Sequence, residues 1–136
     1  MTRRIPFSVV TKPTGAACNL DCQYCFFLSK ELLYDAGAQT MSEGTLERYV
    51  EAFLESSPDG EVTMLWQGGE PTLRGLGFFE RLIELCERYR RPTQRVRHAL
   101  QTNGTLVTEE WARFFADHGF LVGVSIDGPA PLHDAY

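Results

Sequence analysis

The chain has 136 residues, of which 43% are hydrophobic and 23% are charged, and its formal net charge is −5. This length and composition suit one soluble globular domain with a sizeable core. The acidic balance argues against nucleic-acid binding through a broad basic surface, and no apolar run is long enough to span a membrane. We therefore expect neither nucleic acid nor a membrane as a partner.

A short strand is predicted at residues 7–11, where a β-branched run lies between two prolines. Three cysteines follow with the spacing C-x3-C-x2-C, namely Cys18, Cys22 and Cys25. A cubane iron–sulfur cluster contains four irons and is normally held by four cysteines. Three thiolates leave one iron without a protein ligand, and that iron can bind a small molecule. The spacing therefore predicts a [4Fe-4S] cluster with one open site.

Other interpretations of these cysteines remain. Three cysteines so close together cannot all pair, so a disulfide framework leaves at least one over. A structural zinc site is the stronger alternative, but it usually needs four ligands. The only other cysteine, Cys86, is predicted to lie in an amphipathic helix, where it is most simply a core residue. Metal binding requires reduced thiols, so we expect a cytoplasmic protein.

Helices and strands alternate along the rest of the chain. Ser42 is a suitable N-cap for a helix whose apolar residues recur at helical spacing. Further helices are predicted at residues 78–89 and 109–118, and further strands at residues 62–66, 96–101 and 120–126. This alternation is typical of βα units around a parallel sheet. The nearly continuous apolar character of two strands agrees, because parallel strands are buried on both faces.

Small and polar residues gather directly after the predicted strands. They are Gly68, Gly69 and Glu70 after the second strand, Thr102, Asn103 and Gly104 after the third, and Ser125 and Asp127 at the end of the fourth. In a parallel βα sheet these positions share one edge with the cysteines, and ligands bind at that edge. Turn formation alone would explain any one of them, but four such segments at one edge predict a binding site.

The residue types at this edge predict the chemistry of the ligand. Gly68 and Gly69 would let the backbone approach closely, with carbonyl groups that can accept from an ammonium group, and Glu70 would add negative charge near it. Tyr24 offers a ring on which a base can stack. Ser125 can hydrogen-bond a carboxylate or a ribose hydroxyl. An amino acid joined to a nucleoside would use all of these groups, and S-adenosyl-L-methionine (SAM) is such a ligand.

The cysteine spacing and the Gly-Gly-Glu-Pro run at residues 68–71 resemble those of the radical SAM enzymes. The flanking motifs narrow this resemblance to the anaerobic sulfatase-maturating enzymes. They are KPTGA at residues 12–16, WQGGEPTL at residues 66–73, QTNGTL at residues 101–106 and GVSIDGP at residues 123–129. The resemblance extends over nearly the whole chain.

The resemblance implies a partial (β/α)6 barrel with parallel strands. It assigns the cluster to the three loop cysteines and SAM contacts to Tyr24, Gly69 and Ser125. It also implies that an electron from the reduced cluster cleaves SAM to methionine and a 5′-deoxyadenosyl radical, which starts the oxidation of a sulfatase cysteine or serine to Cα-formylglycine. The implied partners are a sulfatase polypeptide and an electron donor such as flavodoxin or ferredoxin.

Members of this family are much longer, and their C-terminal part carries cysteines for two auxiliary clusters and an aspartate proposed as the catalytic base. We therefore expect residues 1–136 to be the N-terminal portion of the radical SAM core, and we assign no catalytic base within it. Two alternatives remain: a radical SAM maturase of another peptide, and a zinc or iron–sulfur module without catalysis. The Gly-Gly-Glu segment argues against the second, because neither zinc nor electron transfer needs an ammonium site.

Overall fold

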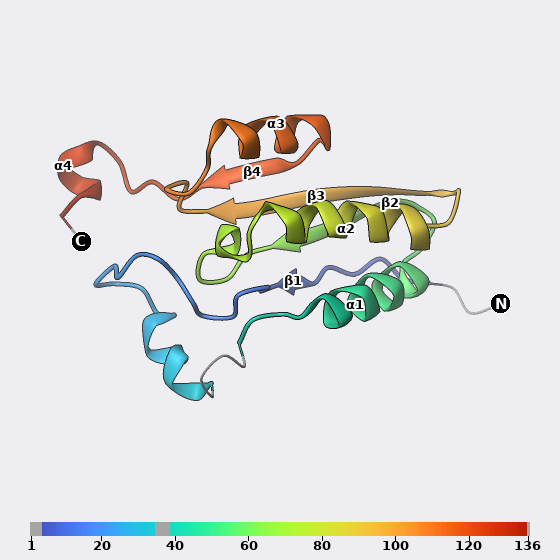
Figure 1. The fold of residues 1–136 in the computed structure, drawn as a ribbon, viewed down its shortest axis with the longest axis horizontal. Helices are drawn as coiled ribbons and strands as arrows, with labels where there is room; N and C mark the ends of the chain where they lie inside the picture. The colour runs from blue at the N-terminus through green and yellow to red at the C-terminus, as the bar shows by residue number, and fades with distance from the viewer. Residues whose placement is uncertain (1–3, 35–38, 136) are drawn as a thin grey trace.

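The computed structural model describes residues 4–34 and 39–135, and its centre is one four-stranded parallel sheet in the order β1-β2-β3-β4 (Figure 1). The strands are β1 (Val10–Thr11), β2 (Gly60–Trp66), β3 (Gln94–Thr102) and β4 (Leu121–Val124). The helices are α1 (Glu43–Ser56), α2 (Leu76–Tyr89), α3 (Glu109–Asp117) and α4 (Ala130–His133), with 3-10 helices η1 (Leu28–Leu33) and η2 (Pro71–Arg74). The predicted α/β class with parallel strands is confirmed.

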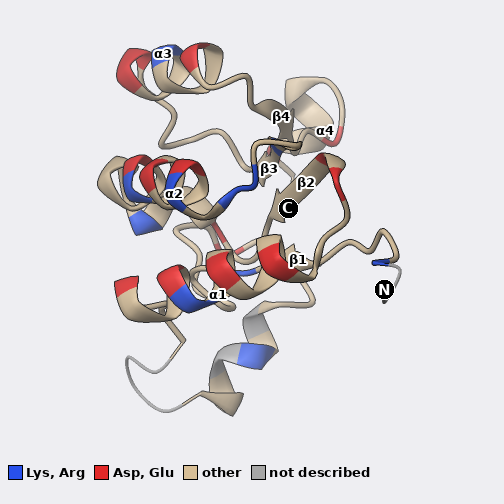
Figure 2. Cartoon of the chain, turned by 90° about the vertical axis from the view of Figure 1, so that its right-hand side faces the viewer, with Lys and Arg blue, Asp and Glu red and all other residues tan. Residues whose placement is uncertain are grey.

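Helices α1, α2 and α3 form one layer along the sheet, which is seen from the end in Figure 2. The core lies between this layer and the strands. Phe79 of α2 is fully buried there, and its ring meets Trp66 and Trp111 edge to face at centroid distances of 5.8 and 5.6 Å. Cys86 belongs to the same core, where its Sγ lies 3.7 Å from the Met64 Sδ. The expectation that Cys86 is a core residue is confirmed.

The predicted helix starts agree with the structure where a side-chain cap is present. The Ser42 Oγ accepts the Thr45 N–H at 3.1 Å, and the Thr108 Oγ1 accepts the Trp111 N–H at 3.4 Å. Helix α2 begins at Leu76, two residues earlier than predicted, directly after Gly75 with φ of 81°. No side chain caps this end, so the sequence carries no capping signal for it.

The strand ends differ more from the prediction, because pairing sets them. Strand β1 is shorter than the predicted residues 7–11, since only Val10 and Thr11 find partners in β2. Strand β4 is shorter than residues 120–126, and the Phe120 N–H donates instead to the Phe115 carbonyl at the end of α3. Strand β3 is longer than predicted, because it pairs with a neighbour on each side.

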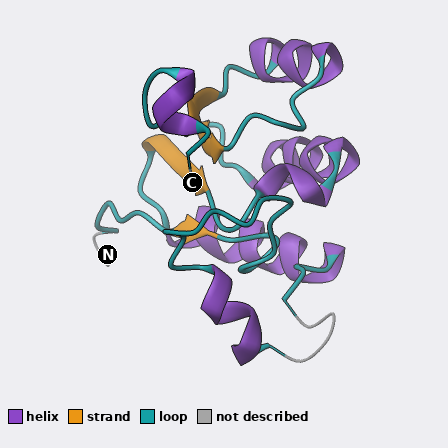
Figure 3. Cartoon of the chain, turned by 90° about the vertical axis from the view of Figure 1, so that its left-hand side faces the viewer, coloured by secondary structure: helices purple, strands orange, loops and turns teal. Residues whose placement is uncertain are grey.

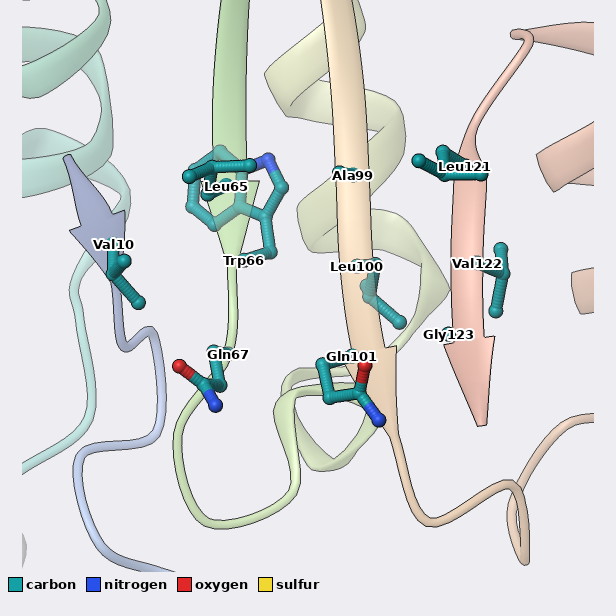
Figure 4. A pocket seen from close by; sticks show the side chains of 10 residues that line it. All are labelled: Val10, Leu65, Trp66, Gln67, Ala99, Leu100, Gln101, Leu121, Val122 and Gly123. Carbon is teal, nitrogen blue, oxygen red and sulfur yellow. The ribbon is translucent and has the colours of Figure 1, made fainter. Parts of the chain in front are cut away.

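The second face of the sheet carries no helical layer in the described part of the chain. Val10, Leu65, Ala99 and Leu121 stand in one row across this face, and they line a cavity of about 460 Å³ (Figure 4). Leu121 is 74% exposed. The expectation that the strands are buried on both faces is therefore wrong within the described residues. None of the helices described is long and apolar enough to cross a membrane.

His98 is a buried titratable group in β3. Its Nδ1 accepts a hydrogen bond from the Trp66 Nε1–H at 3.4 Å, and its ring stacks on Phe120 with centroids 4.8 Å apart. Burial, with a smaller contribution from His118, lowers the pKa of His98 to about 4. The neutral imidazole is thus the form that the fold stabilises.

This depressed pKa predicts a loss of stability in acid. The contribution of His98 is fully present above its ordinary pKa of 6.5 and is lost as the pH falls through about 4. The free energy of unfolding is expected to fall by at most about 3 kcal/mol from this group. Urea unfolding over a pH series measures it. His98→Gln should flatten the acid slope, while the exposed His133→Gln should keep it; equal slopes in wild type and His98→Gln would contradict the prediction.

Candidate functional site

The loops that follow the four strands emerge together at the C-terminal edge of the sheet, because all the strands are parallel (Figures 1 and 3). Residues 12–25, here called the cysteine loop, follow β1. Residues 67–70, the double-glycine bend, follow β2. Residues 103–108 and 125–129 follow β3 and β4. The segments in which the sequence predicted ligand-binding residues therefore lie at one edge.

The three cysteines of the loop are free thiols, and each is partly exposed. Burial is the first cause that raises the pKa of the Cys22 thiol, and the nearby Cys25, Cys18 and Asp127 raise it further. The Cys18 Sγ accepts hydrogen bonds from the Leu20 N–H at 3.4 Å and from the Asn103 Nδ2–H at 3.8 Å. Cys18 is thus bonded both to its own loop and to the residue that follows β3.

No group of three or more Cys, His, Asp or Glu side chains converges on a single-ion site within residues 4–34 and 39–135. A cubane binds its cysteines through different irons, so it does not require the sulfurs to meet at one ion. Cys86 is held in the core by α2 and is 3% exposed. It does not extend the donor set of the cysteine loop.

The double-glycine bend packs its backbone directly on the cysteine loop. The Gly69 N–H donates to the Gly15 carbonyl at 2.9 Å, and the Glu70 N–H donates to the Ala17 carbonyl at 2.7 Å. A Cβ placed on Gly69 would lie 1.9 Å from the Ala17 carbonyl oxygen. Gly68 has φ of 148°, a conformation that favours glycine. The glycines therefore permit a close contact within the protein itself, and their carbonyl contacts to a ligand stay a prediction.

Glu70 is fully buried, and the structure gives its carboxylate protein partners that the sequence did not predict. Its Oε1 accepts the Thr72 N–H at 3.0 Å, the Thr72 hydroxyl at 2.6 Å and the Thr102 hydroxyl at 2.7 Å. Its Oε2 accepts the Asn103 N–H at 2.8 Å. The side chain thus ties the bend after β2 to the end of β3. The expected interaction of Glu70 with an ammonium group stays a prediction.

Tyr24 extends from the cysteine loop to the segment after β4. Its hydroxyl donates to the Asp127 Oδ2 at 2.6 Å, and this bond is the main reason why the pKa of Tyr24 rises to about 12. The Asp127 N–H donates to the His133 Nδ1 at 3.3 Å. A cavity of about 240 Å³ lies between these residues and Cys22. Asp127 and His133 were given no ligand contact from sequence, because nothing along the chain indicates that Tyr24 bonds to Asp127, a residue 103 positions away.

Ser125 lies directly after β4 and is held by the end of β3. Its N–H donates to the Thr102 carbonyl at 2.9 Å, and its Oγ accepts the Gln101 Nε2–H at 2.9 Å. A Cβ on Gly123 would lie 2.2 Å from the Gln101 Oε1, so the glycine leaves room for this amide. Figure 4 shows the side chains of Gln67 and Gln101 toward the C-terminal end of the cavity on the open face. Strand alternation was a signal that could have placed Gln101 on this face.

The edge-bound cysteines, the glycine bend and the parallel sheet are the features of one class of protein. The sequence profile of the radical SAM superfamily matches residues 13–136, and the chain belongs to this superfamily. Membership confirms SAM and, through the family, a [4Fe-4S] cluster as the cofactors expected from the sequence.

Among curated proteins, the chain is similar to sulfatase-maturating enzymes of both target types. It is 42% identical to the serine-type anaerobic sulfatase-maturating enzyme of Bacteroides thetaiotaomicron, over 96% of this chain and 32% of the relative. It is also 42% identical to the cysteine-type enzyme of Clostridium perfringens, over 95% of this chain and 35% of the relative. The chain thus spans about a third of the length of these relatives.

The chain is also similar to solved structures over nearly its whole length. The chain matches the native anSMEcpe with bound AdoMet at a TM-score of 0.85 and 42% identity, over 94% of this chain and 34% of that one. It matches the native anSMEcpe with bound AdoMet and Cp18Cys peptide at a TM-score of 0.84 and 40% identity, over 96% of this chain and 34% of that one. The predicted radical SAM fold is confirmed by these matches.

The contact at Gly69 predicts a sharp effect of one methyl group. In Gly69→Ala the new Cβ cannot be placed without moving the backbone of the cysteine loop, so stability should fall by about 1–3 kcal/mol, as for overpacked sites. Gly77→Ala is the matched control, because its Cβ meets nothing within 4 Å and lies in α2, where alanine should add about 0.5–1 kcal/mol. Urea unfolding of the apoprotein decides; a Gly69→Ala variant as stable as wild type would contradict the contact.

Proposed function

We propose that this chain is the cofactor-cleaving part of a radical SAM enzyme that oxidises a cysteine or serine of a sulfatase to Cα-formylglycine. The observation that carries this proposal is the direct packing of the double-glycine bend on the cysteine loop, at 2.7 Å between the Glu70 nitrogen and the Ala17 oxygen. This packing brings the three thiols and the glycine backbone, which could bind the amino group of an amino acid, together at one edge of the sheet. The similarity to both serine-type and cysteine-type maturases supports the substrate class.

The donor set fits a cluster with one open iron. Cys18, Cys22 and Cys25 are free, partly exposed and close together in one loop, and thiolates are the ligands that iron–sulfur clusters use. A bound metal centre favours the thiolate form, which offsets the burial and neighbouring groups that raise the pKa of Cys22. We assign the three cysteines to the cluster on this basis.

The remaining residues at the edge would hold SAM. Tyr24 is 61% exposed and presents its ring while Asp127 fixes its hydroxyl. Gly68 and Gly69 would offer carbonyl groups to the ammonium group, with Glu70 directly behind them. Ser125 would bind the carboxylate or ribose from the end of β4. When bound, the reduced cluster and SAM supply a carbon-centred radical, and the protein's part is to orient the reactants and to exclude side reactions.

The partners follow from this chemistry. A sulfatase polypeptide is the proposed substrate, and a low-potential protein such as flavodoxin or ferredoxin is the proposed electron donor. Reduced thiols favour the cytoplasm as the compartment. Neither nucleic acid nor a membrane is needed for this reaction.

Anaerobic reconstitution with iron and sulfide tests the cluster. The protein should gain broad absorbance near about 400 nm, and Cys18→Ala, Cys22→Ala or Cys25→Ala should each remove most of it because a ligand is lost. Cys86→Ala is the matched control: it removes a buried thiol away from the loop, so it should lower stability and keep the absorbance. Zinc uptake at one ion per chain without iron would instead support a zinc module.

The proposed substrate is tested in a separate assay with the reconstituted enzyme. With a chemical reductant and SAM, the enzyme that contains this chain should form 5′-deoxyadenosine and convert a sulfatase peptide to its formylglycine form, as measured by mass spectrometry. Peptides with cysteine or serine at the target position give the target type. SAM cleavage that leaves both peptides unmodified would favour a maturase of another peptide.

A further inference from the structure

Asn103, at the end of β3, contacts the cysteine loop with an amide whose orientation is fixed. Its Oδ1 accepts the Thr105 N–H at 2.9 Å and the Thr105 hydroxyl at 2.8 Å. A backbone N–H can only donate, so the oxygen of the amide must face Thr105. The Nδ2 therefore faces the opposite way, where it lies 2.9 Å from the Asn19 Oδ1 and 3.8 Å from the Cys18 Sγ.

Glu70 fixes the backbone of Asn103 relative to the cysteine loop. Its buried Oε2 accepts the Asn103 N–H at 2.8 Å, while its own N–H donates to the Ala17 carbonyl at 2.7 Å. The same residue is thus bonded on one side to the amino acid before Cys18 and on the other to the residue that faces the Cys18 sulfur. A carboxylate that accepts several hydrogen bonds in a buried site is a strong anchor.

We infer that Asn103 is a positioning residue that tunes the cluster: its Nδ2–H donates to the Cys18 sulfur and raises the reduction potential, and Glu70 holds it in place. This inference rests on the proposed function, in which Cys18 binds an iron. Reduction adds negative charge to the cluster and its sulfurs, so an N–H donor stabilises the reduced form more than the oxidised form. Hydrogen bonds to the sulfurs are one of the factors that set iron–sulfur potentials.

The test is a redox titration of the reconstituted protein, followed by electron paramagnetic resonance without SAM. In Asn103→Ala the donor is lost, and the ratio of reduced to oxidised cluster at a fixed potential should fall roughly threefold to tenfold. By the one-electron conversion, this is a downward shift of about 30 to 60 mV. Asn103→Asp should shift in the same direction and further, because it keeps an acceptor for Thr105, lacks the donor and adds a negative charge that disfavours reduction.

Thr105→Val is the matched control. It removes the hydroxyl that bonds Asn19 and Asn103 but leaves the Thr105 N–H, which orients the amide. Its potential should equal that of wild type. Iron per chain is measured in every variant, because a merely structural role for Asn103 would change cluster content or stability and not the potential.

The outcomes distinguish a failure of the tuning role of Asn103 from a failure of the proposed function. Full clusters with unchanged potentials in both Asn103 variants would overturn the tuning role alone. Loss of the cluster from both variants would assign Asn103 a structural role instead. An equal shift of the potential in Thr105→Val would show that the shift does not come from the Asn103 donor, and would overturn the tuning role as well. A wild-type protein that takes up iron and sulfide but forms no [4Fe-4S] cluster would overturn the proposed function first, and the tuning role with it.

Discussion

The structure depends on a backbone contact between two loops at the end of a parallel sheet. Gly69 and Glu70 approach the residues before Cys18 so closely that a single added methyl group would overlap a carbonyl oxygen. The buried Glu70 carboxylate then fixes this contact to the end of β3. The cysteine loop is also bonded to the residues that follow β3 and β4, through Asn19 and Tyr24. Strand β1 can place the cysteine loop with only two residues, because the segments that follow β2 and β3 also bond to this loop.

The sequence predicted most of what depends on neighbours along the chain. Ser42 and Thr108 cap their helices through residues three positions away, and Cys86 lies on the apolar face of α2 as the spacing indicated. These features are visible in a single stretch of sequence because the interactions that form them span only a few residues. The cysteine spacing lies in one such stretch, and its assignment to a cluster stays a prediction. The close contact of Gly69 with Ala17 joins two distant segments and was not predicted.

What the sequence did not predict depends on residues that meet from distant segments. The carboxylate of Glu70 looks from sequence like a free negative charge, but its partners Thr102 and Asn103 lie 32 and 33 positions further on. The extent of β1 and β4 is set by pairing partners rather than by propensity, and so both were predicted too long. The exposure of one sheet face could not be read from apolar strands, because the same residue types suit a strand that is covered on one side or on both.

The contact between Gln101 and Ser125 has a further consequence for the polarity of the site. An amide nitrogen is only a donor, so the Gln101 Nε2 occupies a lone pair of the serine oxygen. The serine proton cannot return along that bond and has to be given to another acceptor. The Gln101–Ser125 hydrogen bond forms because Gly123 has no side chain, which leaves room for the Gln101 amide against β4. A missing methyl group on β4 thereby sets the direction in which the hydroxyl directly after this strand donates its proton.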